Sequence, residues 1–179
     1  MPTVMSHAVV GAALGHVTAY RRRPRAFWLM SALLPVLPDL DVFGRAVGIP
    51  FYSSWGHRGV SHSLAAAAVI GIATALLLHR RLGAGPAPLA VYFAAVTASH
   101  GLLDALTTGG PGVAFFAPFD TTRYFFPWRP IPVSPLAAHF FSAWGWRVFT
   151  VELAMIWLPA GVVMLLARAL ARTLNAAGR

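Results

Sequence analysis

The sequence predicts an all-α integral membrane protein, a bundle of about five spanning helices with an irregular cap outside the bilayer. Hydrophobic residues make up 58% of the 179 residues and charged residues only 11%, against about 25% in an ordinary soluble domain. So little charge cannot cover a water-exposed surface. Several apolar stretches also approach the ~20 residues that a helix needs to cross a bilayer. The length suits one domain, so we expect residues 1–179 to form a single membrane-embedded unit.

Five apolar stretches account for the predicted spans. The first two, Val4–Tyr20 and Ala26–Leu40, are short and are separated by an arginine-rich run, which predicts a tight helical hairpin. Pro35 and Pro38 are expected to distort or end the second helix. The other three stretches are longer: Val60–His79, Pro86–Leu106 and Val148–Ala167, the last with Pro159 in its middle. The connection between the third and fourth stretches is short, so these helices are expected to be antiparallel neighbours.

The first stretch carries a glycine pair on one helix face. His7, Gly11 and Gly15 follow one another at intervals of four residues and therefore lie on the same side of a helix. Small residues let a second helix approach closely, although a chain rich in small residues also produces such pairs by chance. The arginines follow this stretch instead of preceding it, which argues against a cleaved signal peptide.

The stretch Thr107–Arg147 is unlike the predicted spans. It contains six prolines and many aromatic residues, and proline interrupts helices. Aromatic rings are favoured at the interface between membrane and water. We therefore expect this stretch to form an irregular cap that lies at the membrane surface.

The charge of the chain predicts its orientation. Fourteen arginines and no lysine give a net charge of +9. In the five-span arrangement nine arginines fall on one side and five on the other, and the positive-inside rule makes the nine-arginine side cytoplasmic. This predicts a cytoplasmic C-terminus, with the N-terminus and the cap on the extracytoplasmic side. Membrane lipid is the expected partner of the arginines. Nucleic acid is not expected, because no recognition motif is present.

Acidic residues and histidines gather at the extracytoplasmic end of this predicted bundle. A charge at the centre of a spanning helix costs roughly 2.5–3.5 kcal/mol, so the default interpretation of such a residue is functional. His16, His79 and His139 are expected to have interfacial or structural roles. The gathered residues are all five acids and four histidines: Asp39, Asp41, Asp104, Asp120, Glu152, His7, His57, His62 and His100.

The spacing of these residues is typical of metal ligands. His100 and Asp104 are four residues apart and share a helix face, and Asp39 and Asp41 point the same way if their turn is extended. The chain has no cysteine, which excludes thiolate zinc sites and iron–sulfur clusters. Imidazole and carboxylate ligands suit zinc or manganese, so we expect one or two divalent ions, most simply Zn²⁺. The candidate ligands are His7, Asp39, Asp41, His57, His62, His100, Asp104 and Glu152.

Each motif alone also has a simpler interpretation. A histidine and an aspartate on one helix face form an internal hydrogen bond as often as they bind a metal together. The sequence Pro38–Asp41 is more often a helix-terminal turn, and a lone His7 is more often interfacial. Glu152 is either a ligand or a partner that orients a histidine. Their convergence at one end of the bundle is what favours a metal site.

Three motifs, Leu37–Asp41, Gly56–Ser63 and Ser99–Thr107, resemble in this order the YdjM-like family of bacterial inner-membrane, metal-dependent hydrolases. The helical His/Asp pattern is more distantly similar to zinc-dependent phospholipase C and the P1-type nucleases. The resemblance implies a multi-pass protein of the bacterial inner membrane. It also implies hydrolysis through a metal-activated water, and we expect the substrate to be a phosphoester, lipid or lipid-linked.

In this hypothesis Asp39 or Asp41 bridges two ions or acts as the base. Arg58 is expected to stabilise a phosphoryl transition state. Arg123 is a second candidate for that role, although an ion pair with Asp120 is the simpler alternative. The alternative class is a non-enzymatic membrane protein with a structural metal, or a metal or proton transporter. A site at one end of the bundle favours the enzyme, because transporter sites usually lie near the bilayer midplane between repeats.

Overall fold

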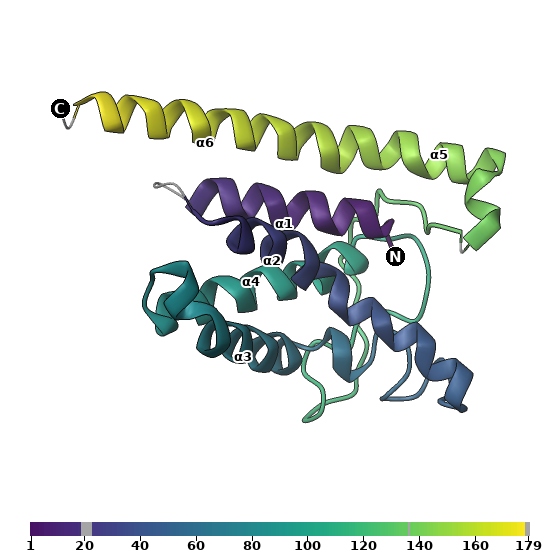
Figure 1. The fold of residues 1–179 in the computed structure, drawn as a ribbon. Helices are drawn as coiled ribbons and strands as arrows, with labels where there is room; N and C mark the ends of the chain where they lie inside the picture. The colour runs from purple at the N-terminus through teal and green to yellow at the C-terminus, as the bar shows by residue number, and fades with distance from the viewer. Residues whose placement is uncertain (19–22, 136, 178–179) are drawn as a thin grey trace.

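The computed structural model describes residues 1–18, 23–135 and 137–177 (Figure 1). Within these ranges the regular elements are helical, apart from two isolated β-bridges. The all-α class predicted from the sequence is therefore confirmed. The α-helices are α1 (Val4–Thr18), α2 (Arg25–Leu33), α3 (Leu64–Leu82), α4 (Pro86–Ala105), α5 (Ala143–Glu152) and α6 (Leu158–Ala177).

Four helical segments are long and apolar enough to cross a membrane: Arg25–Val47, Leu64–Leu82, Pro86–Ala105 and Ala143–Leu174. The fifth apolar segment, α1, has 15 residues, or about 22 Å at 1.5 Å per residue, which is less than the ~30 Å bilayer core. The five segments occur in the predicted order. Residues 19 and 20, with which the predicted first span ends, lie outside the described residues.

The helices are stacked in layers (Figure 1). α5 and α6 continue into one another as a long rod beside α1, and α2 and α4 lie on the other side of α1. α3 packs against α4 as the predicted antiparallel neighbour. A Cβ atom at Gly71 would lie 2.4 Å from the Ala94 nitrogen, so this approach requires glycine. The apolar core consists of Phe27, Leu34, Ala75, Leu82, Leu89, Phe93 and Val96.

The glycine face of α1 is a packing face, which decides between the two interpretations left open by the sequence. A Cβ atom at Gly11 would lie 1.9 Å from the carbonyl oxygen of Ser31, and one at Gly15 would lie 3.0 Å from the Trp28 ring. α2 therefore rests directly on the backbone of α1. His7, one turn before Gly11, is fully buried.

The second helix does not end at its prolines. At Leu34 the α-helix changes into a 3₁₀ helix, η1 (Leu34–Val47), which has Pro38 inside it. Proline lacks the N–H that an α-helix needs and crowds the preceding turn, so the winding changes. The predicted end at Leu40 is wrong, and Asp39 and Asp41 lie inside a longer helical segment.

The third helix starts later than predicted. Residues Val60–His62 form a single 3₁₀ turn, η2. The Ser63 side chain then accepts a hydrogen bond from the Ala66 nitrogen at 3.0 Å and caps α3. His62 therefore precedes the helix instead of beginning it, and His57 lies in the loop before η2.

The cap is irregular, as predicted, but shorter. Between Leu106 and Pro135 the chain forms only bridges, Thr107 with Ile131 and Val113 with Tyr124. A short 3₁₀ helix, η3 (Ala137–Phe141), follows. The last helix begins at Ala143 instead of Val148, because the Ser142 side chain caps it by accepting from the Gly145 nitrogen.

Pro159 does not break the last helix. The irregularity lies just before it, where Leu153–Trp157 form one π-helical turn, η4, between α5 and α6. Such a turn contains one extra residue and commonly marks a place where side chains need a special direction. Ile156 and Ala160, on either side of Leu158, are buried.

Candidate metal centre

Six predicted ligands come together at the end of the bundle where α1 begins and α4 ends. They belong to four separate elements and the loop before η2, and all are buried. The side chains form three overlapping groups in which the possible ligand atoms lie within 4.8 Å of one another. The groups are His7, Asp39 and His100; Asp39, His57 and His62; and His62, His100 and Asp104.

Asp39 and Asp104 each approach the same pair of histidine nitrogens. The Nε2 atoms of His62 and His100 are 2.9 Å apart. Asp39 Oδ1 lies 3.7 Å from the first and 3.4 Å from the second, and Asp104 Oδ2 lies 3.7 and 3.8 Å from them. Ligand atoms ~2.0–2.1 Å from a tetrahedral zinc ion lie about 3.3 Å from one another. Each carboxylate oxygen therefore has a spacing to the histidine pair close to that of ligands around one ion.

Two carboxylates of the centre lack hydrogen bonds. Neither oxygen of Asp39 and neither oxygen of Asp104 has a hydrogen-bond partner among the described residues, although both side chains are buried. Both ring nitrogens of His7 are also without a partner. Buried polar groups are normally paired, and an unpaired buried carboxylate is costly. The donor set is thus suited to a bound cation.

The orientation of His100 follows from the two prolines of η1. Pro38 has no N–H, so the Pro35 carbonyl lacks the donor that a 3₁₀ helix provides three residues later. His100 Nδ1 takes that place and donates to the Pro35 oxygen at 2.7 Å. The proton of the neutral ring is therefore on Nδ1, and the lone pair of Nε2 faces the centre.

Asp41 has a different role from the one predicted. Its carboxylate lies 2.8 Å from His57 Nδ1 and 3.1 Å from His62 Nδ1, and it accepts from Ser61 Oγ at 2.6 Å. These contacts engage both oxygens, so the geometry does not favour the predicted roles of Asp41 as a bridging ligand or as the base. It orients the two histidines from behind, as carboxylates behind metal-binding histidines commonly do.

The carboxylates also control the protonation of His62. Burial alone lowers the pKa of this imidazole. Asp39, at 3.7 Å, and Asp41, at 3.1 Å, outweigh burial and raise the pKa of His62 to about 9. Without a metal, this end of the bundle therefore holds a proton at neutral pH.

The Arg58 side chain points towards the cluster and lies against Asp104. Its backbone has a φ of 62°, unusual outside glycine, and this turns the side chain inward. Nε lies 2.8 Å from Asp104 Oδ2, and the other nitrogens donate to Thr107 Oγ1 at 3.1 Å and to the Gly109 carbonyl at 3.0 Å. The predicted role on a phosphoryl group is not what this geometry favours, because the guanidinium already neutralises Asp104.

Arg123 ties the His57 loop to the cap. Its guanidinium donates to the carbonyls of Ser53 at 2.9 Å and of His57 and Arg58 at 3.2 Å. The alternative pairing with Asp120 is wrong, since Asp120 accepts from the Thr122 nitrogen at 2.8 Å instead. Arg123 is thus a positioning residue in this structure, and its predicted catalytic role has no geometric support.

Glu152 does not join the cluster. One oxygen accepts from the Thr3 nitrogen at 2.8 Å, and the other accepts from the hydroxyls of Thr3 and Ser6. Trp157 donates to the Ser6 hydroxyl at 2.8 Å. These donors satisfy the carboxylate, so the geometry does not favour the predicted role of Glu152 as a metal ligand. It attaches the last helix to the start of α1, one residue before His7.

Three supporting groups escaped the sequence analysis: the Pro35 carbonyl, Ser61 and Thr107. The available signal for the first was the Pro-x-x-Pro spacing of Pro35 and Pro38, which removes a specific backbone donor. Ser61 and Thr107 lie inside two of the motifs that carry the family resemblance, but their contacts depend on tertiary packing and leave no signal in the local spacing.

The fold and the cluster together define a multi-pass α-helical membrane protein with a buried histidine–aspartate centre at one end of its bundle. The chain belongs to the YdjM inner membrane protein family, whose model matches residues 1–174. It is 34% identical over 165 residues to the inner membrane protein YbcI of Escherichia coli (strain K12), covering 92% of this chain and 95% of that protein. No solved structure matches the chain. The predicted family and inner-membrane location are confirmed.

Proposed function

We propose that the protein is an integral-membrane, metal-dependent hydrolase. The observation that supports it most is the buried Asp39 carboxylate, which has neither a hydrogen bond nor an arginine partner among the described residues, beside the Nε2 atoms of His62 and His100. Imidazole and carboxylate suit zinc, with manganese as the alternative. A divalent metal held there supplies a water whose pKa falls to about 7.

His57 is the residue best suited to exchange a proton near this centre. Its Nδ1 lies 2.8 Å from Asp41 Oδ1, so the neutral ring carries its proton on Nδ1 and keeps Nε2 as an acceptor. It also completes a possible ligand group with Asp39 and His62. His57 therefore either accepts a proton or binds a second ion, and Asp41 orients it in both cases.

The surface around the centre suits a phosphoester substrate that is a lipid or is linked to a lipid. The end of η1 and the loop that leads to His57 expose large apolar side chains, which suit contact with lipid at a membrane surface. The arginine distribution favours an extracytoplasmic location for this end. The exposed side chains are Phe43, Val47, Tyr52 and Trp55.

A structural metal site in a non-enzymatic protein is the second candidate, and burial favours it. His7, His100 and Asp104 are fully buried, and Arg58 is engaged by Asp104 instead of facing a substrate. Transport of metal or protons is less well supported, because the cluster lies at one end of the helices instead of near their middle.

Metal analysis of the purified protein, combined with a hydrolysis screen, separates these candidates. We expect about one zinc per chain and turnover of phosphomonoesters, phosphodiesters or phospholipids that chelator removes and zinc restores. His100→Ala should lose metal and turnover, whereas His79→Ala, at the far end of α3, should keep both. Bound zinc without turnover of any of these substrates would favour the structural role. Turnover that survives complete metal removal would contradict the proposal.

A further inference from the structure

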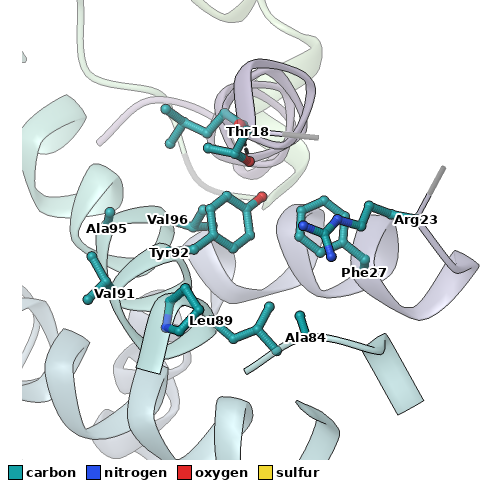
Figure 2. A pocket seen from close by; sticks show the side chains of 11 residues that line it. Thr18, Arg23, Phe27, Ala84, Leu89, Val91, Tyr92, Ala95 and Val96 are labelled. Atoms are coloured by element: carbon teal, nitrogen blue, oxygen red, sulfur yellow. Dashed lines mark hydrogen bonds between the residues drawn. The ribbon is translucent and has the colours of Figure 1, made fainter. Parts of the chain in front are cut away.

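A cavity of about 410 Å³ lies at the opposite end of the bundle, between α1, α2 and α4 (Figure 2). Its volume falls in the range of ligand-binding sites. Apolar side chains form most of its wall, and three polar side chains, Thr18, Arg23 and Tyr92, lie around it (Figure 2). It does not overlap the metal centre.

The hydroxyl groups of this cavity already donate within the protein. Thr18 donates to the Leu14 carbonyl at 3.1 Å. Ser31 donates to the Phe27 carbonyl at 2.8 Å, so the 2.6 Å contact between Tyr92 and Ser31 has Tyr92 as its donor. Arg23 is therefore the side chain with hydrogens left for a ligand.

Arg23 has no anionic partner among the described residues. The residue is half-buried, its Nε is buried and has no hydrogen-bond partner there, and its guanidinium lies 5.5 Å from the centre of the Phe27 ring. The five acidic side chains of the chain all belong to the metal centre, the cap or the α1–α5 contact at the other end. A guanidinium in this setting is suited to bind an anion from outside the chain.

The position of the cavity identifies the anion. α1 ends at Thr18, α2 begins at Arg25 and α4 begins at Pro86, so Arg23 lies where the apolar segments reach the level of the lipid head groups. From there the apolar wall runs along Phe27 and Leu89 towards Val96. We infer that this cavity binds one anionic phospholipid, with its phosphate on Arg23 and an acyl chain between α1 and α4. The inference does not depend on the proposed hydrolase activity.

Native mass spectrometry of the detergent-purified protein tests this inference. The probes are phosphatidylglycerol and phosphatidylcholine with identical acyl chains. We expect one phosphatidylglycerol to be retained about tenfold more tightly than phosphatidylcholine, the size expected of charge-assisted hydrogen bonds. Arg23→Gln should abolish this preference and Arg23→Lys should keep part of it. Arg129→Gln, a matched change in the cap, should not alter it.

Filling the cavity tests the acyl chain separately. Ala95→Phe, on the cavity wall, should weaken the binding of both lipids, whereas Val69→Phe, on the exposed face of α3, should not. Inorganic phosphate should not displace the lipid. An unchanged preference in folded Arg23→Gln protein, unchanged binding in Ala95→Phe, or full displacement by phosphate would each overturn the inference. Thermal unfolding of each variant verifies that any loss of lipid binding is not caused by a loss of the fold.

Discussion

The two ends of this bundle are built from the same helices but carry unpaired groups of opposite charge. Among the described residues, Asp39 and Asp104 are buried without hydrogen bonds where α1 begins and α4 ends, and the Nε atom of the half-buried Arg23 is unpaired where α1 ends and α4 begins. The two ends cannot neutralise each other, because the length of the helices separates them. The comparison shows that one end is suited to a cation and the other to an anion.

Arg58 neutralises part of the negative charge at the end where α1 begins and α4 ends. Its ion pair with Asp104 leaves Asp39 as the carboxylate without a permanent cation. The two aspartates therefore differ in what they contribute: Asp104 is tied to the fold through Arg58, whereas Asp39 is not. The predictions below separate these contributions.

The largest effect is expected from Asp39→Asn. The amide keeps the size of the side chain but removes its charge. Loss of a residue that only orients a ligand lowers metal affinity by about 10–100-fold, so loss of a ligand itself should lower zinc affinity by at least about 100-fold. Turnover should cease. The fold should persist, because no donor of the protein loses its partner. Zinc content and thermal unfolding in chelator measure the two effects. Part of the metal-free stability should be lost near neutral pH, because Asp39 helps to raise the pKa of His62. A loss as large as that of Asp104→Leu would contradict the contrast between the two aspartates.

A second, smaller effect concerns the fold. Asp104→Leu should lose metal and also destabilise the metal-free protein by about 3–5 kcal/mol, because it leaves Arg58 as an unpaired buried charge. Adding Arg58→Met should recover most of that loss of stability without recovering metal. Denaturation of the metal-free single and double variants measures this. Equal stability of Asp104→Leu and the wild type would show that Arg58 does not depend on Asp104.

The third effect is a pH dependence, which is small for each pH unit. The pKa of His62 is about 9 in the metal-free fold, above its ordinary value of 6.5. Its proton therefore stabilises the metal-free fold fully below pH 6.5, and that contribution is lost as the pH rises through 9. Zinc has to displace this proton, so zinc affinity should rise about tenfold per pH unit up to pH 9.

Chelator competition between pH 6 and 9 measures this dependence. Asp41→Asn removes a carboxylate that raises the pKa of His62, so its affinity should level off at a lower pH. The same variant should bind zinc about 10–100-fold more weakly at high pH, because the histidines lose their orienting partner. Parallel curves for the variant and the wild type would contradict the role of Asp41.

The sequence was sufficient for the helices and for the kind of ligands, because both depend on local patterns. Apolar runs predicted the spanning segments, and the four-residue spacing of His100 and Asp104 placed both on one face of α4. The convergence of six buried residues followed from placing the ends of antiparallel helices at the same level of the membrane.

The role of Asp41 could not be predicted because it depends on the winding of η1. In an extended turn, residues two apart point the same way, as we expected for Asp39 and Asp41. In a 3₁₀ helix with three residues per turn they point about 120° apart. One carboxylate therefore faces the centre and the other lies behind the histidines. The inward turn of Arg58 and the Glu152 contact with Thr3 depend on tertiary packing, which leaves no signal in local spacing.

The π-helical turn Leu153–Trp157 determines which side of α6 meets the rest of the protein. Glu152 and Trp157 are five residues apart and both contact the Ser6 hydroxyl, which the wider turn allows. The direction of every α6 side chain beyond Trp157 depends on the winding of this turn. The wider winding absorbs the extra residue, so the faces of α5 and α6 stay in register across the turn. Deleting one residue would leave an ordinary α-helical turn and bring Glu152 and Trp157 to a spacing of four residues, although no residue of the metal centre had changed.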